Sequence, residues 1–253
     1  MADDAFWSIP PDRPIASQDA VHVWRVNLDA AAPILIDTAN VLSSAECGRA
    51  DRFHFVADRD RFVARRVWLR LVLSSYLGLR PESVLLQTTE FGKPFVESAQ
   101  ARDPIRFNLS HSSGRALLAV TLGREVGVDL ERIRAELIRE TVAESFFSPH
   151  ELTALRFLPV EQQPEAFFNC WTRKEAYIKA KGLGLSLPLN SFDVTLRPGD
   201  PARLLATRPD AEEAGRWSMS SLNAYPGYAA AFVSEGEKWS LSCWTWQPKG
   251  ATS

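Results

Sequence analysis

The sequence predicts an α+β protein made of two similar halves in one chain, and three observations support this prediction. Segments that alternate between apolar and polar residues, as half-buried strands do, recur in both parts of the chain. Two long segments with apolar residues at helical spacing each lead into a strand. The third observation is a repeat, in which Trp68-Leu69-Arg70 and Trp171-Thr172-Arg173 stand at similar distances before Gly78-Leu79 and Gly182-Leu183. A division near residue 104, into halves 1–104 and 105–253, would explain the repeat, although tryptophan, arginine and a final glycine are also ordinary in helices.

The first half is expected to open with a strand and to continue with helices. The segment VHVWRVNL, Val21–Leu28, alternates as a half-buried strand does. Ser43 and Glu46 have the spacing of a capping box, in which two side chains satisfy free backbone amides at the start of a helix. A long amphipathic helix is expected over Ala57–Gly78, because apolar residues recur there at roughly helical spacing until the glycine ends it.

Shorter strands follow in chain order. Glycine and serine turns separate them, beginning with the turn Gly92-Lys93-Pro94. The predicted strands lie within Ser83–Phe91, Arg106–Ser110, Arg115–Leu122 and Glu125–Ile133.

Helices are expected to dominate from about residue 136 to residue 181. Ser148-Pro149-His150-Glu151 is a good helix start, with proline at the first helical position and an acid at the third. After Gly182 the chain becomes strand-like again, because proline, glycine and aspartate clusters divide alternating segments: Phe192–Leu196, Arg216–Leu222, Tyr228–Ser234 and Trp239–Trp246.

Composition limits the classes of function. A chain of 253 residues with 45% hydrophobic residues can bury one sizeable core or two smaller ones. The formal charge of −2 provides no global attraction to nucleic acid or anionic membrane, and no apolar run approaches membrane-spanning length. The N-terminus lacks the pattern of a signal peptide, and the three cysteines are too far apart for a disulfide framework or a zinc knuckle. We therefore expect a protein of the reducing cytoplasm, with neither nucleic acid nor membrane as partner.

Two carboxylates are expected to share one face of the strand GVDLERI. Alternation places Val128 and Leu130 on one face and Asp129 and Glu131 on the other. Such a pair repels itself unless it is solvated or neutralised, and a hard divalent cation with oxygen ligands is one way to neutralise it. A solvated strand face is the alternative interpretation.

A third acid and a lysine lie on one face of the second long helix. Glu175 and Lys179 are four residues apart and share a face with Trp171. An exposed ion pair is the ordinary interpretation of that spacing. Three acids able to bind Mg²⁺, together with a lysine able to bind phosphate, are also the residues that phosphoryl transfer requires.

The remaining candidates are basic residues and a histidine. His111, in NLSHSSG, is expected where a strand runs into a turn, either as a surface residue or as an imidazole that binds phosphate with help from Ser110. Arg49, Arg61 and Lys93 are either solvated surface charges or contacts for an anionic ligand. The chain contains no GxGxxG, Walker A, GxSxG or HExxH motif, so the familiar nucleotide, hydrolase and zinc signatures are absent.

Four motifs in order, FNLSHSSG, GVDLERI, FFSPHE and WTRKEAYIKAKGLGL, resemble the 4'-phosphopantetheinyl transferase family, specifically its longer, Sfp-like type associated with nonribosomal peptide and polyketide synthases. The resemblance runs from about residue 46 to residue 197, with GKP before the histidine motif as further support. It implies a pseudo-dimer of two similar α+β halves in one chain, so that the protein is expected to be a monomer. Coenzyme A would lie in a cleft between the halves, with the histidine and acid motifs opposite Arg61 and the GKP turn.

The resemblance also assigns expected roles to individual residues. Asp129, Glu131 and Glu175 match the Mg²⁺-binding acids, and the apolar Leu130 between the first two cannot be a ligand. Lys179 matches the lysine near the pyrophosphate, and His111, with Ser110, matches the phosphate-contacting histidine. The residues expected to bind coenzyme A in the first half are Arg61, Lys93 with Pro94 of the GKP turn and, more loosely, Arg49.

The reaction implied is attack by a serine hydroxyl of an acyl or peptidyl carrier protein on the phosphate that bears pantetheine, which releases adenosine 3',5'-bisphosphate. Serine is a weak nucleophile at neutral pH, so a base is expected, and either Glu175 or a metal-bound water is the candidate. A metal-dependent nuclease or other phosphotransferase would use similar acids but should show a basic nucleic-acid surface or a nucleotide loop. A carrier-binding module without catalysis would be expected to have lost Asp129 or Glu175, and both are present.

Overall fold

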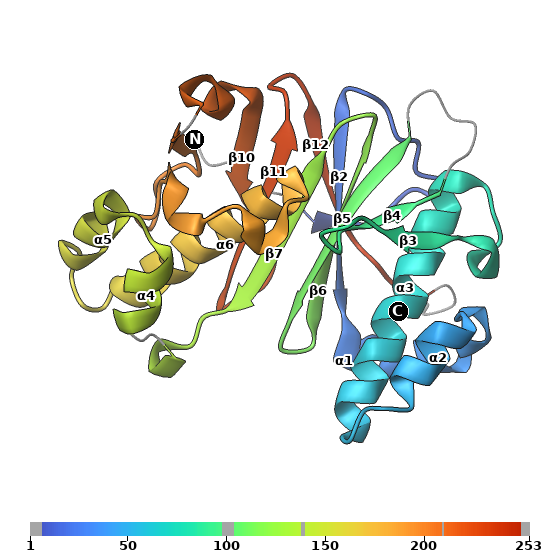
Figure 1. Ribbon diagram of the computed structural model, residues 1–253. Helices are drawn as coiled ribbons and strands as arrows, with labels where there is room; N and C mark the ends of the chain where they lie inside the picture. Colours follow the sequence, from blue (N-terminus) through green and yellow to red (C-terminus); the bar gives the residue numbers. More distant parts are fainter. Residues whose placement is uncertain (1–6, 98–103, 138–139, 209, 249–253) are drawn as a thin grey trace.

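The computed structural model describes residues 7–97, 104–137, 140–208 and 210–248. It forms two sheets in the middle of the molecule, with one group of helices outside each sheet (Figure 1). The first helical group holds α1 (Leu28–Asp37), α2 (Ser44–Ala50) and α3 (Val56–Leu77), and the second holds α4 (Glu140–Phe146), α5 (Pro149–Arg156) and α6 (Gln163–Lys181). The α+β prediction with two halves is therefore confirmed.

The first sheet has five strands in the order β1-β12-β2-β6-β5. Its strands are β1 (Trp7–Ser8), β2 (Ala20–Asn27), β5 (Ile105–Ser112), β6 (Arg115–Leu122) and β12 (Ser240–Thr245). The C-terminal strand β12 pairs in parallel with both β1 and β2, so the two ends of the described chain meet in this sheet.

The second sheet has three antiparallel strands in the order β10-β11-β7, and two short hairpins lie outside both sheets. The sheet strands are β7 (Val126–Arg132), β10 (Trp217–Ser221) and β11 (Tyr228–Glu235). The hairpins pair β3 (Leu86–Thr88) with β4 (Pro94–Val96) and β8 (Phe192–Val194) with β9 (Leu204–Thr207). The predicted division after residue 104 falls just before β5. Strands β5 and β6 follow this division in the chain but join the sheet that contains β2, from the first half, so the division itself stays a prediction.

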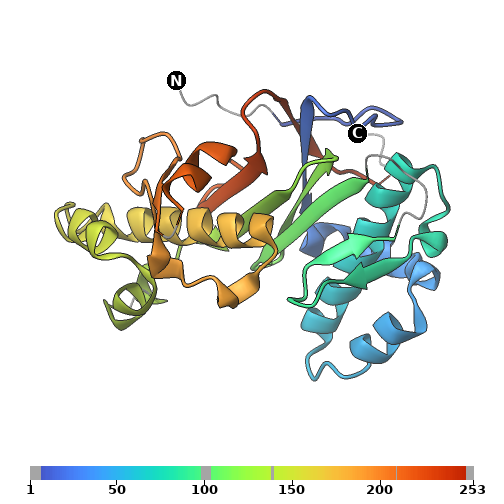
Figure 2. The ribbon, with the colours of Figure 1, turned by 45° about the horizontal axis from the view of Figure 1, so that its top comes forward.

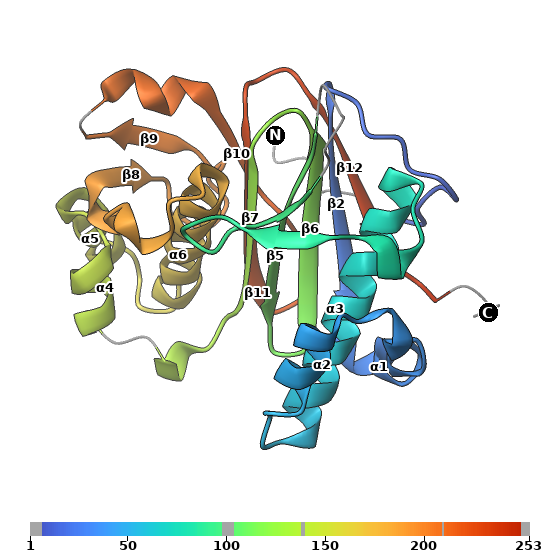
Figure 3. The same cartoon turned by 45° about the vertical axis from the view of Figure 1, so that its right-hand side comes forward.

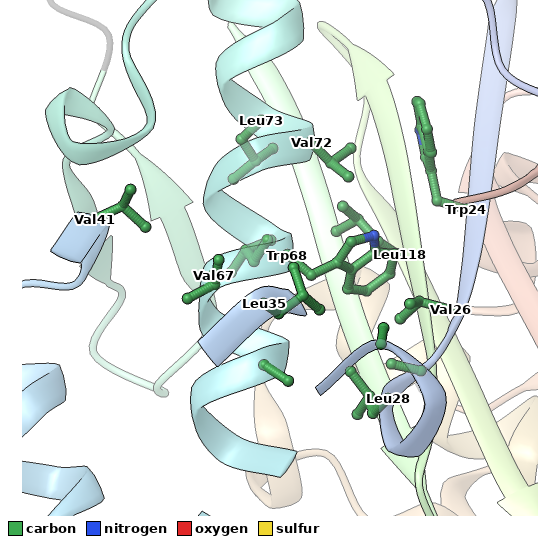
Figure 4. Packing of buried hydrophobic residues seen from close by; sticks show 14 of the residues in the cluster. Trp24, Val26, Leu28, Leu35, Val41, Val67, Trp68, Val72, Leu73 and Leu118 are labelled. Atoms are coloured by element: carbon green, nitrogen blue, oxygen red, sulfur yellow. The ribbon is translucent and has the colours of Figure 1, made fainter. Parts of the chain in front are cut away.

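Three apolar clusters hold these layers together. In the first half, Trp68 points from α3 toward the sheet and packs with Leu35 of α1 and Leu118 of β6 (Figure 4). A second cluster lies between α4–α6 and the three-stranded sheet. A third cluster joins the sheets to each other through fully buried residues of β2, β6, β7 and β11: Val21, Val23, Leu117, Ala119, Val128, Leu130 and Phe232. Burial on both sides of the sheets makes the two halves one continuous body.

Most predicted elements form where the pattern placed them. The capping boxes at Ser43 and Ser148 are present, and Gly78 and Gly182 end α3 and α6 in the left-handed conformation that favours glycine. The strand predicted over Ser83–Phe91 shortens to Leu86–Thr88, since Ser83 belongs to a 3-10 turn and Glu90–Phe91 to the turn before β4. None of the helices in the described ranges is both long and apolar enough to cross a bilayer.

Candidate active site

The two strand acids lie on one face of β7, as predicted. Val128 and Leu130 are fully buried in the cluster between the sheets, whereas Asp129 and Glu131 point the other way. There they line a pocket of about 330 Å³, here called the acid pocket. Its lining residues are Leu109, Ser110, His111, Asp129, Glu131, Trp171, Glu175 and Lys179.

Helix α6 brings the third acid and the lysine to this pocket. It packs against β7 and β11, and two views show it running alongside them (Figures 2 and 3). Trp171, Glu175 and Lys179 are four residues apart, so one face of the helix presents all three to the acid pocket. The structure therefore brings the acids of the strand and the acid and lysine of the helix together in one pocket.

Lys179 pairs with the acid on the neighbouring strand. Its Nζ lies 2.6 Å from Asp129 Oδ1 and 3.4 Å from Ser110 Oγ. Burial lowers the pKa of Lys179, but the negative charges of Asp129 and the two glutamates outweigh that effect and raise it. The lysine is therefore a cation at neutral pH, held at the acids and not in a helix-surface pair with Glu175.

The acid pocket carries more negative charge than one lysine can balance. Asp129 Oδ2 is buried and, among the described residues, has no hydrogen-bond partner. Burial and the charge of Asp129 raise the pKa of Glu131. Burial also raises the pKa of Glu175; the charge of Lys179 opposes this effect, and the charges of Asp129 and Glu131 add to it. Carboxylates destabilised in this way are the donors that a hard divalent cation prefers.

The acids are gathered but do not form a ready-made metal site. Within the described ranges, no group of three or more histidine, cysteine, aspartate or glutamate side chains is arranged so that it could hold a metal ion. The donor chemistry nevertheless fits such an ion, because all three acids line one pocket and an unpartnered carboxylate oxygen lies among them.

Strand β5 supplies His111 and two serines to the same place. The strand extends two residues beyond its predicted end, so that His111 pairs with Ala116 inside the sheet and the turn comes at Ser113–Gly114, where both residues have positive φ. His111 is therefore the last residue but one of the strand, two residues before the turn, which agrees with its expected place where a strand runs into a turn. Partial burial, followed by the positive charges of Arg65 and Lys179, lowers the pKa of His111 to about 4. The side chain keeps access to solvent, and the neutral imidazole is the form expected at pH 7.

The basic residues predicted in the first half have partners elsewhere. Arg61 donates from Nε to Asp29 Oδ1 at 2.7 Å. Lys93 Nζ lies 2.6 Å from Glu125 Oε2 and donates to the Ala180 carbonyl at 2.9 Å, which ties the GKP turn to the end of α6.

Lys93 and Pro94 line a separate pocket of about 190 Å³, next to Arg106 and Glu125. In the part of the chain that the structure describes, Arg61, Lys93 and Arg49 do not line the acid pocket.

Sequence reasoning missed Arg65, one turn after Arg61 on α3. Its Nε is buried and, among the described residues, has no hydrogen-bond partner. Its guanidinium lies 5.6 Å from the centre of the Phe62 ring, and that of Arg49 lies 5.3 Å from the same ring. Burial, then the charges of Arg66 and Arg49, lower the pKa of Arg65 to about 10. The four-residue spacing from Arg61 is the signal that could have identified it.

Comparison with known proteins gives one consistent result. Residues 125–233 match the model described as 4'-phosphopantetheinyl transferase superfamily, and residues 32–122 match the model of a 4'-phosphopantetheinyl transferase N-terminal region. The chain is 40% identical over 235 residues to the 4'-phosphopantetheinyl transferase HetI of Nostoc sp., covering 93% of this chain and 95% of that protein. It is 32% identical to a 4'-phosphopantetheinyl transferase of Bacillus subtilis, covering 68% of this chain and 73% of the relative. Identity to Sfp of Bacillus subtilis strain 168 is 34%, over 57% of this chain and 62% of that protein.

Proposed function

The chain belongs to the 4'-phosphopantetheinyl transferase superfamily, and we propose that it transfers the 4'-phosphopantetheine group from coenzyme A to a serine hydroxyl of an acyl or peptidyl carrier protein. The observation that carries the proposal is the acid pocket, where three acids and a lysine from two elements meet in a chain whose match covers 95% of its relative HetI. The products are holo carrier protein and adenosine 3',5'-bisphosphate.

The reaction exchanges one P–O bond for another. The serine oxygen of the carrier forms a bond to the phosphorus that bears pantetheine, and the bond from that phosphorus to the bridging oxygen of the pyrophosphate breaks. The serine loses its proton, and negative charge grows on the departing phosphate. A site for this reaction must therefore accept one proton and stabilise additional negative charge.

The acid pocket suits a magnesium ion. Asp129, Glu131 and Glu175 would hold it, and all three line the pocket. When bound, Mg²⁺ supplies positive charge that neutralises the pyrophosphate. Leu130 is fully buried on the other face of β7 and contributes no ligand.

Three side chains have distinct tasks in the transfer. Lys179 is protonated, and its ammonium would bind phosphate oxygens as a point charge. A neutral His111 can donate one ring N–H to a phosphate oxygen. Glu175 lines the same pocket, and its carboxylate would accept the serine proton.

The first half would bind the rest of coenzyme A through its basic residues. The charges that act on Arg65 are those of the cations Arg66 and Arg49, so an anionic ligand at its guanidinium would not have to displace a carboxylate. Arg49 lies over the same Phe62 ring. Arg61 and Lys93 stay proposed contacts, although each already has an acidic partner that the ligand must compete with.

We also propose that the enzyme is a cytoplasmic monomer. Cys47, Cys170 and Cys243 are all free thiols, as expected in a reducing compartment. The acids, the lysine and the histidine reach one pocket from a single chain, so that a second copy is not needed to complete the site.

The test is incubation with coenzyme A, Mg²⁺ and an apo carrier protein, followed by intact-mass measurement of the carrier. We expect the mass of one phosphopantetheine group to appear and EDTA to prevent it. Asp129→Asn should abolish the mass shift, whereas Glu136→Gln, which changes an exposed acid outside the acid pocket, should leave it intact. Absence of transfer to every carrier tried, with coenzyme A bound and the fold intact, would refute the proposal.

A further inference from the structure

The two sheets meet at the edge strands β5 and β7, which lie side by side (Figures 1 and 3). In the part of the chain that the structure describes, these strands belong to different sheets and share no backbone ladder. Side chains of β5 take the place of that ladder, and we call their contacts with β7 the β5–β7 seam.

Three side chains of β5 accept the backbone N–H groups of β7 across the seam. Asn108 Oδ1 accepts from Val128 at 2.9 Å. Ser110 Oγ accepts from Leu130 at 3.3 Å, and Ser112 Oγ accepts from Arg132 at 3.2 Å. The spacing of two on both strands follows from the pleat, which points every second side chain of β5 to the same face. All three side chains are buried, so each bond satisfies a backbone amide that water cannot reach freely.

Two of these side chains also hold an acid. Ser110 Oγ donates to Asp129 Oδ1 at 2.8 Å, and Ser112 Oγ donates to Glu131 Oε2 at 2.8 Å. A hydroxyl has one hydrogen to donate, so the carboxylate uses the donor of each serine while the serine oxygen accepts from the amide. Asn108 makes the same kind of bond across the seam beside a valine and therefore serves as a seam contact without an acid.

We propose that Ser112 is a positioning residue that holds Glu131 in the orientation in which it binds a divalent cation, so that one hydroxyl both joins the two sheets and sets a metal ligand. The inference rests on the proposed function, because it takes Glu131 as a ligand. A hydrogen-bonded carboxylate needs less ordering when it binds a metal, and loss of such an outer partner commonly weakens metal binding by about 10- to 100-fold.

The experiment measures Mn²⁺ binding by electron paramagnetic resonance in the presence of coenzyme A, with thermal unfolding recorded on the same samples. Ser112→Ala should raise the Kd for Mn²⁺ by about tenfold or more, because it removes the donor to Glu131. Asn108→Ala is the matched control, since it breaks a seam contact that touches no acid. Asn108→Ala should lower the melting temperature but leave the Kd for Mn²⁺ within about twofold of that of the unaltered protein, as expected for a residue that is not coupled to the metal site.

A second comparison keeps the proposal testable even if the control variant folds poorly. In a Glu131→Gln background, adding Ser112→Ala should change the Kd by less than about twofold, because the two residues act through one contact. Equal shifts in Kd with and without Glu131, or equal shifts from the Ser112 and Asn108 variants, would overturn the proposal and leave Ser112 a purely structural residue. Failure of the unaltered protein to bind Mn²⁺ would instead refute the metal site of the proposed function, and the inference with it.

Discussion

Strand β7 packs directly against the backbone of helix α6 at Gly127, where an added side chain would not fit. A Cβ added to this glycine would lie 2.0 Å from the Ala176 carbonyl oxygen and 2.4 Å from the Ala180 amide nitrogen. Both are backbone atoms, so no rotamer change can relieve the clash. Residues 176 and 180 directly follow Glu175 and Lys179, and the contact therefore sets the distance between the helix that carries these two residues and the strand that carries Asp129.

Gly127→Ala should separate the two elements by more than an ångström. Ordinary contact begins at 3.4 Å, so the Ala176 oxygen must retreat by about 1.4 Å from its 2.0 Å separation. A displacement of about 1 Å in catalytic groups can reduce the rate about 100-fold. Overpacking of this kind also costs about 1–3 kcal/mol of stability. The variant should thus remain folded at moderate temperature while its transfer rate falls by about two orders of magnitude.

The assay follows transfer to a carrier protein by intact mass, with circular dichroism to monitor folding. Gly215→Ala is the matched control, because a Cβ there meets nothing within 4 Å and the backbone does not have a positive φ. The control should keep its transfer rate within about twofold, as expected for a surface substitution. A folded Gly127→Ala variant with the rate of the control would refute the argument that close packing of β7 on α6 positions the site.

Three further predictions concern charge. Asp129→Asn keeps the shape but removes the negative charge that pairs with Lys179, and the transfer rate should fall at least about 100-fold at ordinary Mg²⁺, as measured by carrier mass. Transfer by the unaltered protein that EDTA does not reduce would contradict the metal site. Glu175→Gln should lower kcat by about 10² to 10⁴ while calorimetry shows the Kd for coenzyme A changed by less than about tenfold. Equal losses in kcat and in coenzyme A affinity would mean that Glu175 acts chiefly as a metal ligand and that its role as the base is wrong. Arg65→Ala should raise the KM for coenzyme A by about tenfold or more, because a charge-assisted contact contributes about 1.5–3 kcal/mol. Arg61→Ala should raise the KM for coenzyme A less than Arg65→Ala does, since Asp29 already holds the Arg61 guanidinium. A larger rise for Arg61→Ala would contradict this assignment of phosphate contacts. It would also be contradicted if both variants kept the full preference for coenzyme A over dephospho-coenzyme A.

Local patterns predicted the elements that carry the site. The helix α3 was predicted almost to the residue, because its apolar spacing and its glycine end are both local signals. Helix α1 was missed, since it begins directly after β2 and contains Pro33, which weakens a helical pattern. Strand β9 was missed because its residues are largely exposed and show little alternation.

The sharing of a face was predictable for the acids, but their partners were not. Periods of 2 and 3.6 placed Asp129 beside Glu131 and Glu175 beside Lys179 within each element. The bond from Lys179 to Asp129 and the bonds across the β5–β7 seam join residues 19 to 50 positions apart. Such contacts depend on which strands become sheet edges, and that is fixed by the packing of the whole chain rather than by any local pattern.

Charge balance in the acid pocket then links metal, substrate and pH. With all three acids ionised, Lys179 offsets one of the three negative charges and two remain, so the pocket by itself repels a pyrophosphate. A divalent cation would balance those two charges, and under the proposed function the basic residues of the first half would attract the substrate. The Lys179 ammonium occupies Asp129 Oδ1, and no other described residue bonds Oδ2, so one carboxylate can serve the lysine and a second cation together. Because the pKa values of Glu131 and Glu175 are raised, protons compete with the cation for these acids, and affinity for the metal should weaken as the pH falls toward those values.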